Sequence, residues 1–270
     1  MLYCEHMDWA ERRKLTYVAL VLVFFGVVAF AIIHNVTNIT PTCFDHKQNG
    51  NETGVDCGGG CNVYCPSQLA DPVIEWVRVF PVTPGLVDAV AYITHDYPIA
   101  SAKSVGYEFK LYDADNNQIA DRTGTTFLGP AGNSAIVETL IPIANGTVSL
   151  ARFSFVDPIS WKKVSPNFSQ VVINTDHNTI STFSSAVPGG VATRLTATLQ
   201  NQSRFNFSNL DVVAIFYDKD GNAITASKEL LPSLSGLQST TMYFTWPYSI
   251  ANIARVEIIP RFNPFNATSL

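Results

Sequence analysis

The most prominent hydrophobic pattern in this chain is an apolar run without a polar face, from Leu15 to Ile33. At about 1.5 Å per residue, a helix of that length spans roughly 28 Å, close to the hydrocarbon thickness of a bilayer. A soluble helix would show a polar stripe, which this run lacks. We therefore predict a transmembrane helix over 15–34, preceded by a short stub over 1–14.

The charges beside this run predict its orientation. Arg12, Arg13 and Lys14 precede it directly, and the next basic residue is Lys47. Basic residues stay on the cytoplasmic side, so we expect a cytoplasmic stub, a single pass through the cell membrane and an extracytoplasmic C-terminal part. The alternative is a cleavable signal peptide with a small-x-small site at Ala29–Ala31. The run is longer than a usual signal core, which favours an uncleaved signal-anchor whose partner is the lipid bilayer.

From Asp71 onward the pattern changes to short alternating segments between Gly, Pro, Asn and Asp. Residues 73–80 alternate as a strand does, and Pro81 and Pro84 are expected to end it. Further strands are expected at similar spacing, over 86–94, 104–112, 117–128, 134–142 and 147–156. Short strands without a helical period predict a mainly β fold with antiparallel sandwiches or barrels.

One part of this pattern recurs at a constant offset of 105 residues. Tyr107–Ala120 aligns without gaps onto Val212–Thr225, and Ala89–Thr94 matches Arg194–Leu199 in the same way. A repeat of this length predicts two tandem sandwiches, over 71–164 and 167–264, rather than a solenoid. A short linker near Ser165 would let them tilt slightly.

The recurring unit centres on Tyr112-Asp113 in the first copy and Tyr217-Asp218 in the second. A ligand contact is one interpretation of these residues. The plainer interpretation is structural, because Tyr packs over a sheet and Asp begins the polar turn of a hairpin.

The first copy, Phe109-Lys-Leu-Tyr-Asp113, resembles the FxLYD and LEA14-like group of immunoglobulin-like β-sandwiches. The second copy, Ala214-Ile-Phe-Tyr-Asp218, lacks the leading Phe and the Leu. The resemblance implies exported, envelope-associated modules of immunoglobulin-like fold without catalytic activity.

Between the apolar run and the first strand lies a short neck, 43–66, with four cysteines at Cys43, Cys57, Cys61 and Cys65. It has too few apolar residues to form a core, so covalent crosslinks are needed. On the outer side of a membrane these cysteines predict two disulfides, with three possible connectivities. A zinc site is the alternative, but zinc ligands usually occur in C-x2-C pairs.

The neck also offers oxygen ligands between Gly-containing turns, at Asp45, Asn49, Glu52 and Asp56. Such ligands on a crosslinked loop suit Ca²⁺. The alternative is that Asn, Asp and Gly are simply turn formers. No other cofactor is expected. The segment from Cys43 to Cys65, which contains ETGVDCGGGC, resembles a short cysteine-rich motif of bacterial surface proteins, including those of Patescibacteria. That resemblance implies a surface location.

Composition limits the functional classes. The net charge of −5 and the lack of a basic block argue against nucleic-acid binding. None of the five His lies in a nucleophile, zinc or acid–base motif, so we expect no enzyme. The chain has eight N-x-S/T sequons, where roughly three are expected by chance. Glycosylation and a surface simply rich in Asn, Ser and Thr both explain this excess.

The sequence thus favours a non-enzymatic, membrane-anchored extracytoplasmic protein for cell-surface adhesion or envelope scaffolding. One alternative is an accessory subunit of an envelope secretion or filament machine. Another is a receptor-like binder of ligands or glycans.

Overall fold

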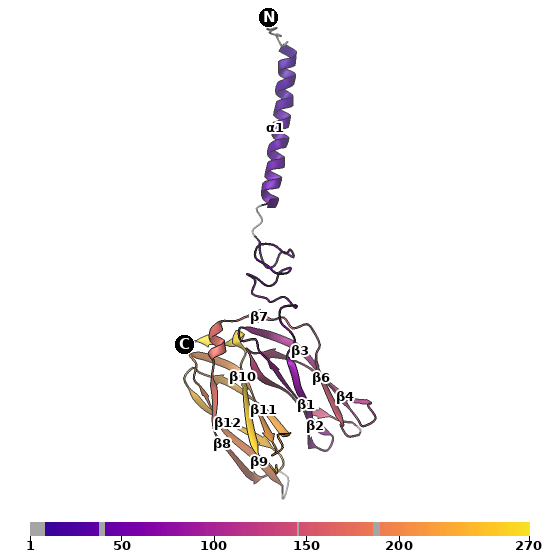
Figure 1. Ribbon diagram of the computed structural model, residues 1–270, viewed down its shortest axis with the longest axis vertical. Helices are drawn as coiled ribbons and strands as arrows, with labels where there is room; N and C mark the ends of the chain where they lie inside the picture. The colour runs from indigo at the N-terminus through magenta and orange to yellow at the C-terminus, as the bar shows by residue number, and fades with distance from the viewer. Residues whose placement is uncertain (1–8, 38–40, 145, 186–189) are drawn as a thin grey trace. The chain divides into compact units, whose positions relative to one another are not determined.

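The computed structural model describes residues 9–37, 41–144, 146–185 and 190–270 (Figure 1). It divides into two compact units, Met1–Asp56 and Cys57–Leu270. The neck expected over 43–66 is therefore shared between them. Residues 1–8 of the expected stub lie outside the described residues.

The first unit contains one long helix, α1 (Trp9–Thr37) (Figure 1). It begins before Leu15, since Glu11, Arg12, Arg13 and Lys14 are all good helix formers. Its apolar side chains are exposed. The stretch Trp9–His34 is long and apolar enough to cross a membrane.

The second unit is built from antiparallel strands, which confirms the mainly β fold class. Its first half contains β1 (Val73–Thr83), β2 (Leu86–His95), β3 (Ala100–Tyr112), β4 (Gln118–Leu128), β5 (Gly132–Pro142), β6 (Leu150–Phe155) and β7 (Lys162–Lys163). Its second half contains η1 (Pro166–Gln170), β8 (Ile173–Ser184), β9 (Val191–Asn201), β10 (Phe205–Tyr217), β11 (Ala223–Leu234), β12 (Ser239–Trp246), β13 (Arg255–Arg261), η2 (Pro264–Asn266) and β14 (Thr268–Ser269).

The two halves pair their strands in the same order. The first half forms the sheets β1-β2-β5 and β4-β3-β6, with β7 added to β3. The second half forms β8-β9-β12 and β11-β10-β13, with β14 added to β10. In each half the two sheets bury one apolar core between them. Phe109 and Ile93 lie in the first core, and Phe216 and Leu199 lie in the second.

A third buried cluster joins the two halves. Val90 and Val137, on β1-β2-β5, belong to the same cluster as Val213 and Ile215 on β11-β10-β13. The second unit is therefore a stack of four sheets in which the two inner sheets are covered on both faces. The expectation that a short linker lets the two sandwiches tilt is wrong, because tilting would expose this shared cluster to water.

The burial patterns of β10 and β12 reflect this stacking. Along β10, all six residues Val212–Tyr217 are buried, since alternate side chains enter two different cores. On the outer strand β12, buried Met242, Phe244 and Trp246 alternate with exposed residues. A continuous apolar run thus marks an inner strand, and alternation marks an outer one.

The expectation that Pro81 ends the first strand is wrong. β1 continues to Thr83, and Pro81 pairs with Val87. β1 is an edge strand of its sheet, so one side of its backbone needs no ladder hydrogen bond. Proline is therefore tolerated there.

The offset of 105 holds for β3 and β10, but not for the faces of β2 and β9. Phe109 and Ala214, separated by 105, both face the core of their own sandwich. Ala89 also faces its core, whereas Arg194 is exposed and the core residue is Leu195. Because side chains alternate along a strand, the equivalent of Ala89 lies one residue later than the sequence alignment places it.

Candidate functional site

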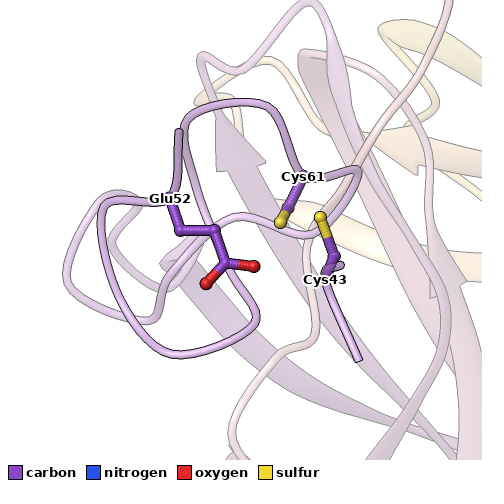
Figure 2. A group of neighbouring side chains, drawn as sticks. All are labelled: Cys43, Glu52 and Cys61. Carbon is purple, nitrogen blue, oxygen red and sulfur yellow. The ribbon is translucent and has the colours of Figure 1, made fainter. Parts of the chain in front are cut away.

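The four neck cysteines, Cys43, Cys57, Cys61 and Cys65, are all disulfide-bonded. One of the disulfides joins Cys57 to Cys65, whose Cα atoms are 5.0 Å apart. Oxidised sulfurs are not the thiolates that zinc requires. Figure 2 shows the side chains of Cys43, Glu52 and Cys61, a group whose residue types alone would suggest a metal site. Since both sulfurs are in disulfides, only the carboxylate of this group could act as a ligand.

The carboxylates predicted to bind Ca²⁺ accept hydrogen bonds from the neck backbone. Asp56 accepts from the backbone N–H groups of Asp45 and His46, at 3.0 and 3.1–3.2 Å. Glu52 accepts from the backbone N–H groups of Asn49 and Asp56. These oxygens therefore stabilise the turns of the loop, which is the turn-former interpretation of the same residues.

Asp45 and Asn49 complete this arrangement. The Asn49 side-chain amide donates to Asp45 Oδ2 at 2.7 Å, and this bond lowers the pKa of the Asp45 carboxyl. Asn49 Oδ1 is buried and accepts no hydrogen bond among the described residues. The four predicted ligands thus lie together in one loop, but most of their oxygens are already used by N–H donors. Calcium binding stays a prediction.

Within the second unit, the later part of the neck is attached to the first sandwich. Val63 forms a β-bridge with Lys162 of β7, and the Tyr64 N–H donates to the carbonyl of Trp161. Lys163 Nζ donates to the carbonyl of Gly59 at 2.6 Å. The crosslinked segment therefore continues the fold of the sandwich.

The recurring Tyr-Asp pairs begin two hairpin turns of the same geometry. Asp113 Oδ1 accepts from the backbone N–H groups of Asp115 and Asn117, and Asp218 Oδ1 accepts from those of Asp220 and Asn222. These bonds lower the pKa of both carboxyls. Asn116 and Gly221 occupy the same position of the turn with φ of 66° and 79°. Both Asp side chains thus have the turn-forming role that the sequence suggested.

The two Tyr of these pairs have different surroundings, and Tyr112 is half-buried beneath the guanidinium of Arg152. Tyr217 is buried between the sandwiches, and its hydroxyl donates to Glu257 at 2.8 Å. Tyr92, from the other sandwich, donates to the second oxygen of Glu257 at 2.7 Å. Burial and the bond to this carboxylate raise the pKa of Tyr217 to about 12, and that of Tyr92 further. Glu257 thus links two phenols, one from each sandwich. The sequence did not reveal this link.

Arg261 is a second cross-link that the sequence did not reveal. Its guanidinium donates to Ser134, Thr126 and the carbonyl of Phe127 in the first sandwich, and lies 3.3 Å from Asp211 in its own sandwich. Burial lowers its pKa, while Asp211 opposes that shift. A buried cation needs such partners, so this network fixes the register of the two sandwiches.

The two outer faces of the stack differ in chemistry. The outer surface of β4-β3-β6, here called the charged face, carries Glu108, Lys110, Asp121 and Arg152, and Lys110 pairs with Glu108 at 2.8 Å. The outer surface of β8-β9-β12, here called the hydroxyl face, carries Thr196, Thr198, Thr241 and Thr245.

The hydroxyl face contains one arginine between two aromatic rings. The Arg194 guanidinium carbon lies 4.6 Å from the ring centre of Phe183 and 5.7 Å from that of Tyr243. Phe183 is 39% exposed and Tyr243 is 56% exposed. Within the described part of the chain, the Arg194 guanidinium has no carboxylate partner. The alternation of polar and apolar residues along β12 is the feature of the sequence that could have predicted this exposed face.

A hollow at the β1–β2 turn has a volume of about 430 Å³. Its lining is mainly apolar and includes Val79, Pro84, Leu86 and Val148, with no titratable side chain among the described residues. His95 is buried elsewhere, against Tyr97 and Trp161.

No family model and no curated protein matches the chain. Solved structures with some likeness include the tandem CBM22-1–CBM22-2 domain of Paenibacillus barcinonensis Xyn10C, at 7% identity and a TM-score of 0.16, over 76% of this chain and 86% of that one. A mutant form of Bacillus subtilis oxalate decarboxylase is similar at 10% identity and a TM-score of 0.11, over 82% of each chain. At these scores the likenesses do not establish a shared fold.

Proposed function

We propose that this chain is a non-enzymatic, membrane-anchored protein whose two sandwiches act outside the cytoplasm in cell-surface adhesion or envelope scaffolding. The apolar helix α1 suits an uncleaved signal-anchor, and disulfides form and persist in oxidising compartments. The two halves have the same strand order, which supports two tandem modules. The proposal includes an immunoglobulin-like fold for each module.

The observation that carries the adhesive part of the proposal is the arrangement around Arg194. Its guanidinium is held between Phe183 and Tyr243, and its N–H groups have no carboxylate partner among the described residues. Such a group binds carboxylates through paired hydrogen bonds. The exposed ring of Tyr243 and the neighbouring threonine hydroxyls suit a flat, hydroxylated sugar chain. The partner class of this face is therefore a carboxylate-bearing surface polysaccharide.

This part can be tested by cosedimentation of the full-length protein in nanodiscs with polygalacturonate. We expect Arg194→Ala and Tyr243→Ala each to weaken binding at least tenfold. Arg152→Ala is the matched control, because Arg152 also lies over a tyrosine ring, that of Tyr112, but on the charged face. If the native protein did not bind polygalacturonate, or if Arg152→Ala weakened binding as much as Arg194→Ala, the proposed adhesive role of this face would be wrong.

The alternative, an accessory subunit of an envelope machine, is favoured by the charged face, which is open to solvent and carries both signs of charge. Purification in mild detergent separates the two functions. A stoichiometric complex that is lost with Lys110→Glu would support the subunit function. Protease added to intact cells tests the topology, since the sandwiches should be cleaved only if they lie outside.

A further inference from the structure

The sequons of this chain differ sharply in their surroundings, and the motif alone does not reveal this difference. Five of the eight have a described asparagine side chain, at Asn51, Asn167, Asn201, Asn206 and Asn266. Those of Asn35, Asn38 and Asn145 lie outside the described side chains. The five described sequons fall into two groups.

In the first group the carboxamide is part of the fold. Asn201 is fully buried, and its Nδ2 donates to the carbonyls of Phe205, Leu234 and Ser235, at 2.7, 3.4 and 3.2 Å. Its Oδ1 accepts from the N–H and hydroxyl of Ser203, which is the serine of the same sequon. A substituent on Nδ2 would break these bonds in a site with no space for it.

Asn206 belongs to the same group. It is half-buried, and its Oδ1 accepts from the backbone N–H of Gly236 at 2.9 Å. Its backbone pairs with Thr268 of β14. Both asparagines thus have structural roles that account for their presence without modification.

In the second group, the side chains of Asn51, Asn167 and Asn266 are exposed, and their carboxamides have no hydrogen-bond partner among the described residues. Asn167 lies in η1, where the next residue of its sequon, Phe168, is anchored by stacking on Phe205 at 4.5 Å. Asn266 lies in η2, and the threonine of its sequon, Thr268, is exposed on β14. Neither Asn167 nor Asn266 belongs to the strands of the hydroxyl face.

We propose that Asn51, Asn167 and Asn266 carry N-linked oligosaccharides and that Asn201 and Asn206 do not. The donor class is an oligosaccharide linked to a lipid phosphate, acted on by a membrane transferase. The asparagine Nδ2 forms a bond to the anomeric carbon of the sugar and loses one proton, and the bond between that carbon and the phosphate oxygen breaks. The lipid phosphate leaves with the bonding electrons and the proton. The proposal rests on the extracytoplasmic location proposed above.

The test is peptide mass spectrometry of the full-length chain from membranes of a host with an N-glycosylation machinery on the outer side. We expect sugar on the peptides of Asn51, Asn167 and Asn266, and none on those of Asn201 and Asn206. Asn167→Gln and Asn266→Gln should each remove one oligosaccharide while leaving the yield of folded protein unchanged. Asn201→Gln should leave the oligosaccharides in place and reduce that yield severalfold.

A thiol count on the same sample separates the possible failures. Bare exposed sequons in a chain with two neck disulfides would overturn this inference and leave the proposed location standing. Bare sequons in a chain with reduced neck cysteines would overturn both. Sugar on Asn201 in the folded protein would also contradict the proposal.

Discussion

The Nε atom of Arg261 lies 2.7 Å from the hydroxyl oxygen of Ser134, and the two residues belong to different sandwiches. The same guanidinium also contacts Thr126 of the first sandwich and Asp211 of its own, so one side chain is bonded to two strands across the interface and to one strand of its own sandwich. This polar contact adds to the apolar cluster that joins the two sandwiches in the second unit.

The first prediction concerns this network. Arg261→Ala leaves the Asp211 carboxylate without its ion-pair partner, and we expect the free energy of unfolding to fall by about 3 kcal/mol. Thermal and urea unfolding of the detergent-solubilised protein measures this. Arg78→Ala is the control, because Arg78 also crosses the interface, to Ala223 and Asn222, but at a more exposed position. Its effect should stay near 1 kcal/mol, since surface-accessible hydrogen bonds contribute about that much.

A second prediction uses the difference between inner and outer faces. Val213 is fully buried between the sandwiches, whereas Glu108, 105 residues earlier, lies on the charged face. Val213→Glu places a carboxylate in this apolar cluster, where its cross-strand neighbour Lys228 already donates to the carbonyl of Val137. We expect burial of this carboxylate to cost about 3 kcal/mol and to separate the sandwiches.

Limited proteolysis between residues 164 and 172, together with small-angle scattering, detects such a separation. The reciprocal change Glu108→Val should leave the protease pattern of the purified chain unchanged. Equal protease resistance of the native protein and Val213→Glu would contradict an interface held by this cluster.

The third prediction concerns the disulfide between Cys57 and Cys65, which closes a loop with a sequence separation of 8. Replacing both residues by Ser should lower the free energy of unfolding by about 2.5 kcal/mol through loop entropy. Differential scanning fluorimetry checks the shift, and Cys4→Ser, outside the neck, should leave the melting temperature unchanged. If the double variant melted at the same temperature as the native protein, the hydrogen bonds of Tyr64 and Lys163 would be enough to hold the later part of the neck on the sandwich.

A fourth prediction follows from His95. Burial lowers its pKa below the usual 6.5, and the hydrogen bond to Gly129 only partly opposes that shift. The unfolded chain therefore binds a proton more readily than the folded chain below pH 6.5. Stability should be full above that pH and should fall as pH decreases toward the folded pKa.

His95→Phe preserves the ring packing against Trp161 and should flatten the dependence of the melting temperature on pH between about 7.5 and 5. A pH profile of His95→Phe identical to that of the native protein would assign the effect to other groups.

Much of the local structure could be predicted from the sequence because it depends on near neighbours. The apolar run produces α1 since a helix satisfies its own backbone hydrogen bonds. The turns at Asp113 and Asp218 form from side-chain bonds that reach only four residues along the chain. The hairpin of β3 and β4 therefore lies within a few residues of its expected position, and α1 contains the whole of the expected apolar segment.

The sequence by itself determined the apolar helix, the strands, the oxidised neck and the recurring hairpin of this protein. Only the tertiary structure decided which face of each strand is covered. Val213 and Ile215 could equally have formed an exposed patch, and the sequence did not reveal that Val90 and Val137 cover them. Burial of a β face depends on strands about 75 to 125 residues apart in the chain, and no local pattern encodes that distance. For the same reason the surroundings of Arg261 and Glu257 depend on the packing of the two sandwiches, and those of Arg194 depend on the pairing of β8, β9 and β12.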